Sequence, residues 1–242
     1  MPSKTRNPVT ARRGVSLNVI LTAVVVVVAI AVIGIVLLAN RSDNSGAGSN
    51  ETLRPTGSHT LSQVAGDEVT VVEFLDFQCP ACASFYTNIT KGLEQDYAGR
   101  FTFVPRNFPL QSHPLAVPAA RAAEAAGKQG KYAQMYHALY DGYASWALTE
   151  DGKSVSDDLP RATTRFEEFA TAAGLDLDRF RADVASPEVQ AIIDQGVADG
   201  TKLGVDSTPT FFINGEKFDP QGSTAGEVDR ELRAAIDARL AG

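Results

Sequence analysis

The sequence is poor in cysteine and histidine, and most of it is poor in basic residues. Two cysteines among 242 residues exclude a multi-disulfide scaffold and a four-cysteine iron–sulfur or zinc site. The three histidines, His59, His113 and His137, lack the paired spacing of metal ligands, so no metal is expected. Residues 42–242 hold 17 basic and 29 acidic residues. No binding to nucleic acid is expected either, because phosphates require a basic face.

Residues 1–41 have the opposite character, with five basic residues and no acidic ones. Residues 19–39 form an uncharged apolar run of 21 residues. As a helix this run would be about 31 Å long, which matches the hydrocarbon core of a bilayer. The pattern predicts a basic cytoplasmic tail over residues 1–18, one transmembrane helix over 19–39 and an extracytoplasmic remainder. A cleaved signal peptide is the alternative, although its apolar core would be shorter.

Residues 40–58 have the composition of a linker, since ten of these nineteen residues are Ser, Gly or Asn. Such a segment cannot bury enough apolar surface to order itself. We therefore expect a flexible tether between the membrane and a globular part over residues 59–242.

The globular part alternates between strand and helix patterns. β-branched and aromatic residues predict strands over residues 69–77, 101–108, 210–213 and 216–218. Helical patterns run from residue 80 to 97, over about 114–205, and after the capping box Thr224-x-x-Glu227. The order β-α-β, a long helical stretch, then β-β-α predicts an α/β fold: a small mixed sheet with helices on both faces and a helical insertion.

The chemistry concentrates at Cys79-Pro80-Ala81-Cys82, where the first strand ends and a helix begins. Free N–H groups and the positive end of the helix dipole stabilise a thiolate there, which lowers the pKa of Cys79. The second thiol is close enough to resolve a mixed disulfide. A structural disulfide and a metal site are the weaker alternatives, and haem attachment would require histidine at the position of Ala83.

Three motifs together resemble the DsbA-like thiol–disulfide oxidoreductases, in particular membrane-anchored members from actinomycetes. They are the run from Glu73 to Cys82, the run from Arg106 to Leu110 with His113-Pro114, and the run from Thr208 to Gly215. The resemblance covers about residues 58–240. It implies a thioredoxin-like fold with an inserted helical domain, in agreement with the order of elements above.

The resemblance also implies roles for single residues. Cys79 resembles the nucleophile and Cys82 the buried resolving thiol, so their redox-active disulfide is the only expected cofactor. Pro209 matches the family's cis-proline, which would expose the backbone of Thr208 to an extended substrate. Glu73 matches a buried acid that assists proton transfer to the resolving thiol. For Glu73 an edge carboxylate facing water is the alternative.

Other candidates have weaker signals. His113 precedes a proline, which favours a structural role or a helix start. The aromatic stripe from Tyr132 to Tyr143 is more typical of a core than of a binding site. The pattern assigns no role to Trp146.

Three functions remain open at this point. The first is a monomeric dithiol oxidase whose partners are exported client proteins with reduced cysteines and a quinone-linked membrane protein that reoxidises it, as the resemblance implies. The second is a reductase or isomerase with the same fold. The third is a non-catalytic thiol- or metal-binding module such as a copper chaperone.

Overall fold

The described part of the chain begins at Asn50. The computed structural model describes residues 50–66 and 69–241, which all belong to the unit Gly46–Gly242. The predicted tail over residues 1–18 and the predicted transmembrane helix over 19–39 lie outside the described residues. None of the helices in residues 50–66 and 69–241 combines the length and apolar composition of a membrane span.

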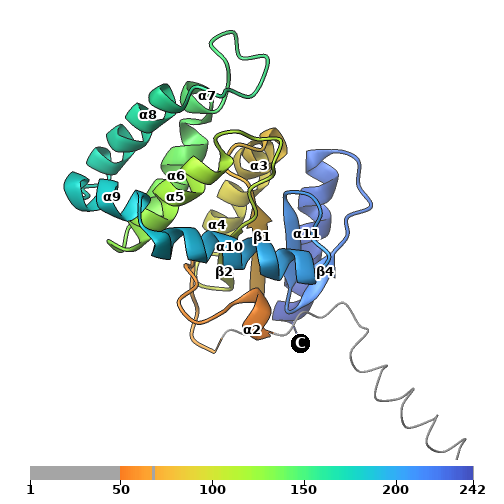
Figure 1. The fold of residues 1–242 in the computed structure, drawn as a ribbon. Coiled ribbons are helices and arrows are strands. Elements are labelled where there is room, and N and C mark those ends of the chain that lie inside the picture. Colours follow the sequence, from red (N-terminus) through yellow and green to blue (C-terminus); the bar gives the residue numbers. More distant parts are fainter. Residues whose placement is uncertain (1–49, 67–68, 242) are drawn as a thin grey trace, which may run out of the picture. The chain divides into compact units, whose positions relative to one another are not determined.

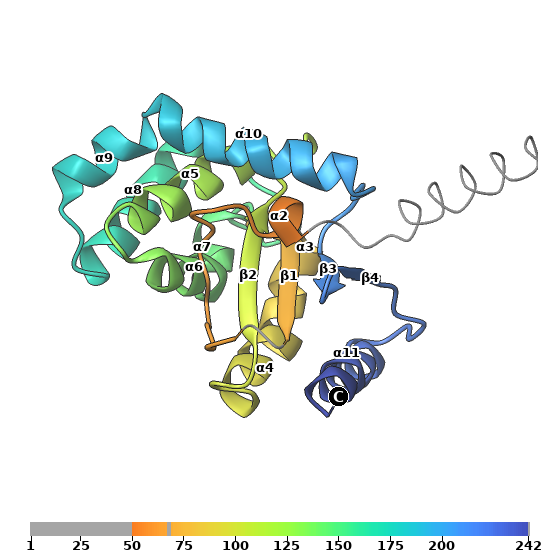
Figure 2. The same ribbon diagram turned by 90° about the horizontal axis from the view of Figure 1, so that it is seen from below.

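A four-stranded mixed sheet forms the centre of this unit. Its strands are β1 (Thr70–Leu75), β2 (Thr102–Asn107), β3 (Thr210–Ile213) and β4 (Glu216–Phe218), in the spatial order β2-β1-β3-β4 (Figure 2). β1 and β2 are parallel, and the other two pairs are antiparallel. Asn214 and Gly215 both have positive φ values, of 49° and 88°, as the two-residue turn between β3 and β4 requires. The mixed sheet and the bounds of β3 and β4 agree with the sequence prediction.

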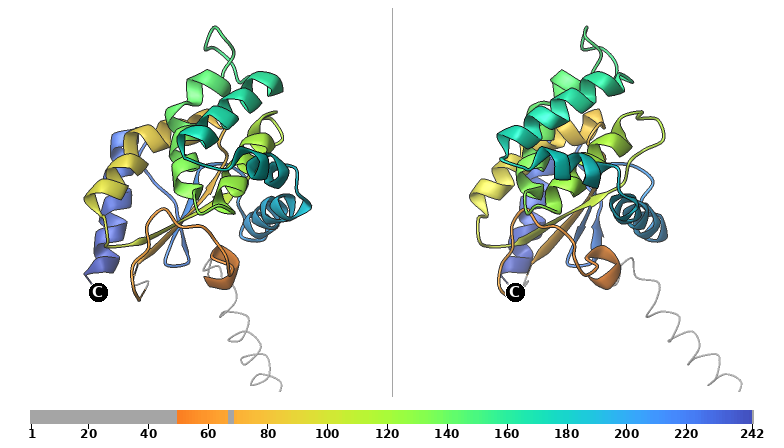
Figure 3. Two further views of the ribbon diagram at one scale, coloured as in Figure 1. Left: turned by 90° about the vertical axis from the view of Figure 1, so that its left-hand side faces the viewer. Right: turned by 60° about the vertical axis from the view of Figure 1, so that its left-hand side comes forward.

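Helices cover both faces of the sheet, as predicted. They are α2 (Asn50–Leu53), α3 (Pro80–Phe85), the π-helical segment η1 (Tyr86–Thr90), α4 (Lys91–Asp96), α5 (Ala116–Gly127), α6 (Tyr132–Asp141), α7 (Tyr143–Trp146), α8 (Leu159–Ala172), α9 (Leu177–Val184), α10 (Pro187–Lys202) and α11 (Ala225–Leu240). Figure 2 shows α2 and α10 on one face, with α4 and α11 on the other. Helices α5 to α10 form the insertion between β2 and β3, and Figures 1 and 3 show α5 to α9 gathered beside the sheet.

Alternation along β1 sends its side chains to different environments. Val72 and Phe74 join the cluster that also contains Leu53 of α2. Val71 and Leu75 belong to the clusters that contain helices α4, α11, α3 and α6. Glu73 lies between Val72 and Phe74 in sequence, so alternation directs it to the face of Val71 and Leu75, where α3 lies.

Two glycines let α10 lie close to the sheet. A Cβ atom at Gly196 would stand 2.4 Å from the carbonyl oxygen of Asn107, and one at Gly200 would stand 2.6 Å from the ring of Phe108. Real Cβ atoms do not approach backbone that closely, so only glycine fits at Gly196. This close packing fixes the last helix of the insertion against the end of β2.

The predicted linker over residues 40–58 is wrong in its second half. Residues 50–53 form the short helix α2, and Leu53 is only 2% exposed. The guanidinium of Arg106 donates hydrogen bonds of 2.8 Å to the carbonyl oxygens of Thr52 and Leu53 and one of 2.6 Å to the carboxylate of Asp199. The buried Arg106 side chain thus holds α2 in place, and the composition of this segment gives no sign of that contact.

Two helical predictions also need correction. The helix expected from residue 80 to 97 is divided by the π-helical turn η1. The stretch expected to be helical over 114–205 is interrupted after Trp146 by a loop that an antiparallel bridge between Leu148 and Val155 closes. In contrast, the capping box of α11 forms as predicted, with Thr224 accepting from the Glu227 N–H.

Candidate active site

The two cysteines occupy different environments at the start of α3. Cys79 is the N-cap residue, with extended backbone (φ −66°, ψ 122°), and Pro80 follows at the first helical position. Both cysteines are free thiols. Cys82 is completely buried, at 0% exposure, as expected for a resolving thiol. Cys79 is nearly buried as well, at 6% exposure, and its Sγ atom lies 3.5 Å from the carbonyl oxygen of Thr208.

The electrostatic environment separates the two thiols further. Hydrogen bonding from Cys82, and then from the Thr208 side chain and the backbone N–H groups of Cys82 and Ala81, lowers the pKa of Cys79 to about 5, although burial opposes this shift. Burial, and then interaction with Cys79, raises the pKa of Cys82. At neutral pH the pair therefore consists of a Cys79 thiolate beside a protonated Cys82 thiol. The N–H groups at the helix start contribute as predicted, but the partner thiol contributes more.

Glu73 lies buried beneath this pair, at 1% exposure. Burial raises its pKa to about 8, while a 3.4 Å hydrogen bond from the Tyr136 hydroxyl group opposes the shift. The charge of Glu73 in turn raises the pKa of Cys82. The alternative interpretation of Glu73 as an edge carboxylate facing water is wrong, because α3 and α6 cover the face of β1 to which it points. A carboxyl group with this pKa can give up or take a proton near neutral pH.

The peptide bond between Thr208 and Pro209 is cis, as the resemblance implied. The loop that contains it lies directly before β3, and β3 pairs with β1. The loop therefore stands beside Cys79, which follows the end of β1. The carbonyl oxygen of Ser207 in this loop accepts a 2.8 Å hydrogen bond from the Thr210 hydroxyl group.

Gln78 is a site residue that the sequence reasoning missed. Its side chain is buried, and its Nε2 atom donates to the carbonyl oxygens of Ala147 at 3.1 Å and Ser156 at 2.7 Å. Its Oε1 atom accepts from the Leu115 N–H at 2.6 Å, and its carbonyl oxygen accepts from the Tyr143 hydroxyl group at 2.7 Å. The residue before the nucleophile is thereby fixed to the insertion. Only its position next to Cys79 could have indicated a role for Gln78 from the sequence, since its hydrogen-bond partners are distant in sequence.

His113 has the structural role that the sequence favoured. Its Nδ1 atom lies 2.6 Å from the buried carboxylate of Asp76, which also accepts from the N–H groups of Gln78 at 2.7 Å and Leu110 at 3.0 Å. Burial raises the pKa of Asp76, and these hydrogen bonds oppose the shift. The pair holds the turn that leads from β1 to Cys79.

The predicted aromatic stripe is core. Tyr132, Tyr136 and Tyr140 of α6 are buried, and Tyr136 and Tyr140 pack on Phe77. Trp146 is fully buried and donates a 2.8 Å hydrogen bond to the Leu139 carbonyl oxygen. It therefore anchors the insertion.

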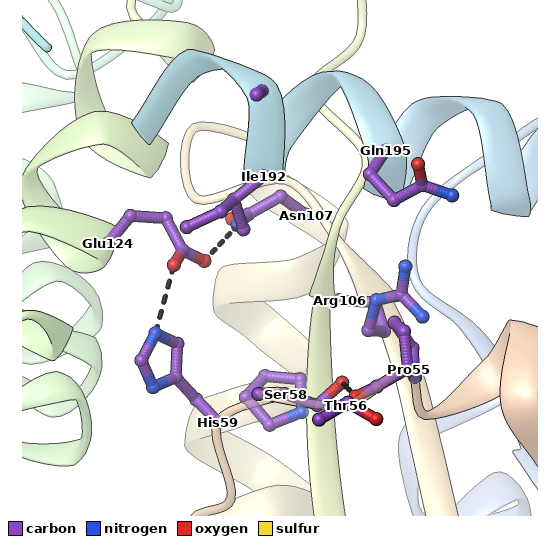
Figure 4. Close-up of a pocket in the computed structure, with 12 residues that line it drawn as sticks. Pro55, Thr56, Ser58, His59, Arg106, Asn107, Glu124, Ile192 and Gln195 are labelled. Atoms are coloured by element: carbon purple, nitrogen blue, oxygen red, sulfur yellow. Dashed lines mark hydrogen bonds and ion pairs between the residues drawn. The ribbon is translucent and has the colours of Figure 1, made fainter. Parts of the chain in front are cut away.

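A pocket of about 380 Å³ lies elsewhere, between the segment after α2, β2, α5 and α10 (Figure 4). His59 and Asn107 point from two sides at the carboxylate of Glu124, at distances of 2.9 Å and 2.6 Å. Neither cysteine lines this pocket. In residues 50–66 and 69–241 no group of three or more His, Cys, Asp and Glu side chains has an arrangement that could hold a metal ion.

Comparisons with known proteins agree with this geometry. The family model described as thioredoxin matches residues 65–238. Oxidised BdbD from Bacillus subtilis superposes with a TM-score of 0.64 at 19% identity, covering 82% of this chain and 98% of that one. A thioredoxin-like oxidoreductase from Silicibacter pomeroyi DSS-3 gives a TM-score of 0.59 at 28% identity, covering 80% and 99%.

A curated relative shares only part of its length with this chain. The Na(+)/H(+) antiporter NhaA 1 of Mycolicibacterium gilvum is 33% identical over 152 residues, which are 62% of this chain and 22% of the antiporter. The chain thus spans about a fifth of the length of this relative. The similarity concerns a segment of the antiporter, and the activity in its name is a property of that whole protein.

Proposed function

This chain belongs to the thioredoxin family and has the DsbA-like thiol–disulfide oxidoreductase fold, and from this premise we propose that it is a dithiol oxidase. In this proposal it introduces disulfides into exported proteins through Cys79 and Cys82. The domain works outside the cytoplasmic membrane, to which residues 19–39 attach it, with residues 1–18 in the cytoplasm. The apolar run and its basic flank support this location.

The observation that carries the proposal is the difference between the two thiols. Hydrogen bonds that lower the pKa of Cys79 to about 5 stabilise its thiolate, which exists only in the reduced protein. Stabilising the reduced form makes the disulfide form a stronger oxidant. A pair with this asymmetry passes its disulfide on readily.

The first half of the cycle forms a mixed disulfide. A client thiolate attacks the Sγ atom of Cys79, the bond between Cys79 and Cys82 breaks, and its electron pair leaves on Cys82. Glu73, whose pKa is about 8, is largely protonated at neutral pH and lies beneath Cys82. It supplies the proton that Cys82 takes up.

The second half releases the client. A second client thiolate attacks the client sulfur of the mixed disulfide, which forms the client disulfide and frees Cys79 as a thiolate. Two electrons then reside on the cysteine pair of this chain. They leave to a quinone-linked membrane protein, the oxidant that the family resemblance suggests, while Glu73 recovers its proton from Cys82.

The direction of exchange tests this proposal. The oxidised full chain, purified in detergent, is mixed with a reduced multi-disulfide protein, and the recovery of that protein's activity is followed. The proposal predicts recovery faster than in glutathione buffer alone. Reduction of the native disulfides of the same protein by the reduced chain, without any acceleration of their formation, would instead establish a reductase.

A further inference from the structure

A completely buried carboxylate stands three residues before the nucleophile. The Asp76 side chain accepts hydrogen bonds from the backbone N–H groups of Gln78 at 2.7 Å and Leu110 at 3.0 Å. Its Oδ2 atom also lies 2.6 Å from the Nδ1 atom of His113. An ionised carboxylate has no proton to give, so His113 is the donor in this contact. The three donors come from two segments that are far apart in the sequence.

The backbone of Asp76 faces both cysteines. Its carbonyl oxygen accepts a 3.1 Å hydrogen bond from the Cys79 N–H. Its own N–H group donates toward Cys82: burial raises the pKa of that thiol, and the hydrogen bond from Asp76 opposes the shift. Leu75 and Phe77, the two neighbours of Asp76 in the chain, belong to the same core cluster as Cys82. The peptide groups of Asp76 therefore lie against the bond that a client must break.

The Asp76 N–H group suits the leaving sulfur of the proposed cycle. When a client thiolate attacks Cys79, the electron pair of the disulfide bond leaves on Cys82, which has 0% exposure. A negative charge that develops in such a place needs a fixed donor, because burying it without one is costly. The N–H group donates a hydrogen bond and keeps its proton, while the proton that Cys82 takes up comes from Glu73.

His113 is well placed to fix this donor. Its N–H donates to the Leu110 carbonyl oxygen at 3.0 Å, and its carbonyl oxygen accepts from the Ala116 N–H at 3.1 Å. The ring that faces Asp76 is therefore carried by a hydrogen-bonded segment between β2 and α5. A small displacement of a stabilising group lowers the rate of a reaction strongly, so an anchor on Asp76 affects the chemistry at Cys82.

We propose that His113 is a positioning residue of the redox pair: through Asp76 it holds the Asp76 N–H group against the Cys82 sulfur, where that N–H stabilises the departing thiolate. The inference rests on the oxidase function above, in which Cys82 is the leaving group. It adds the Asp76 N–H to Cys79 and Glu73 in the step that breaks the disulfide. His113 thus has a kinetic role besides its contribution to the turn.

Two reactions of the full chain in detergent separate this role from a general effect on the fold. In the first, excess dithiothreitol reduces the oxidised chain, so that Cys82 is the leaving group. In the second, Cys82→Ser carries glutathione as a mixed disulfide on Cys79, and dithiothreitol removes it with no part played by position 82. Acid-quenched samples analysed by mass spectrometry give both second-order rate constants.

The variants are His113→Leu, which removes the donor to Asp76, and His113→Asn, whose amide nitrogen takes the place of Nδ1. His59→Leu is the matched control, because His59 lies 2.9 Å from another buried carboxylate, Glu124, in the pocket of Figure 4, which neither cysteine lines. His113→Leu should slow the first reaction by about tenfold and leave the second unchanged. His113→Asn should restore most of the rate, and His59→Leu should change neither reaction.

An unchanged first reaction in His113→Leu would overturn the inference. Equal slowing of both reactions would overturn it too, since His113 would then act on the whole helix start. If His113→Leu does not fold, His113→Gln is compared with His113→Asn, because glutamine carries its amide one bond further from the backbone, and equal rates for the two overturn the inference. Reductase behaviour in the refolding test above would remove the oxidase proposal, and these rate constants do not depend on that result.

Discussion

The sheet half of the described chain and its helical insertion contribute different things to the site. β1, α3 and the loop before β3 supply Cys79, Cys82, Glu73 and the Thr208–Pro209 bond. The insertion supplies no reacting group in the proposed cycle, but Tyr136 donates to Glu73, and Tyr143, Ala147 and Ser156 hydrogen-bond to Gln78 beside the nucleophile. The comparison indicates that strand ends fix the reacting atoms and that the insertion sets their environment and access.

The largest expected effect is in the sheet half, at the two thiols. Cys79→Ser should abolish disulfide exchange, because no thiolate remains at the helix start. In Cys82→Ser the Cys79 thiolate should still attack a disulfide of an oxidised client, and the resulting mixed disulfides should accumulate because the Cys82 thiol that would release the client is absent. Non-reducing gel electrophoresis with mass spectrometry checks both variants. Mixed disulfides that accumulate in Cys79→Ser would contradict the assignment.

The next effect concerns the pH dependence of stability. The pKa of Cys79 is lowered in the folded protein from 9.0 to about 5, so its stabilising contribution is fully present above pH 9 and is lost as pH falls through 5. Only the reduced protein has this contribution, whereas Glu73 titrates in both forms. The free energy of unfolding of the reduced form minus that of the oxidised form should therefore fall by roughly 2–3 kcal/mol between pH 7 and pH 4.

Urea unfolding of both forms at the two pH values measures this difference. The buried Cys82, with its raised pKa, stays protonated throughout this range and does not contribute. A difference that does not change between pH 7 and pH 4 would show that Cys79 is not a thiolate at neutral pH.

The third prediction concerns the contact between α10 of the insertion and β2 of the sheet. Gly196→Ala would place a Cβ atom 2.4 Å from the Asn107 carbonyl oxygen, so α10 would have to move away from β2. The expected cost is about 1–3 kcal/mol in the free energy of unfolding. Gly226→Ala in α11 is the matched control, because its nearest neighbour is 3.9 Å away, and it should be neutral or slightly stabilising. Equal unfolding midpoints for the two variants in urea would refute the close packing.

The smallest of these effects concerns the proton that Cys82 takes up when the Cys79–Cys82 bond breaks. Glu73→Gln keeps a polar group of the same size but cannot exchange a proton, so the breaking of the Cys79–Cys82 bond by a client peptide should slow by about tenfold. Stopped-flow reduction between pH 6 and pH 9, with each rate divided by the thiolate fraction of the client peptide, should show an inflection near pH 8 that Glu73→Gln removes, since the pKa of Glu73 is about 8.

Glu124→Gln provides the control for this prediction. Glu124 is also a buried carboxylate, but it lies in the pocket of Figure 4, hydrogen-bonded to His59 and Asn107. Its replacement should leave the inflection near pH 8 in place. Persistence of that inflection in Glu73→Gln would assign the proton transfer to another group.

The fold was predictable where local patterns agree with each other. The alternating strands, the Asn214-Gly215 turn and the Thr224–Glu227 capping box are short-range signals, and each formed as predicted. The ordered structure of residues 50–58 was not predictable from composition. It depends on the Arg106 guanidinium, which contacts Thr52, Leu53 and Asp199. These contacts require β2 and α10 to be packed together first.

The site was predictable for its reacting atoms but not for their surroundings. The spacing of Cys79 and Cys82 at a helix start indicated a redox pair directly. The leading contribution of Cys82 to the lowered pKa of Cys79, and the covering of Cys79 by Thr208, depend on distances that sequence does not encode. Gln78 shows the same limit, since the partners of its side chain lie 37 to 78 residues away.

The reduction potential of the Cys79–Cys82 pair tests the central claim most directly. The full chain is equilibrated in detergent with glutathione buffers of defined ratio, and the fraction of free thiol is measured by alkylation and mass spectrometry. A thiolate stabilised at Cys79 predicts a potential more positive than about −200 mV, in the range of oxidases. A value near that of thioredoxin, about −270 mV, would contradict the account and identify a reductase.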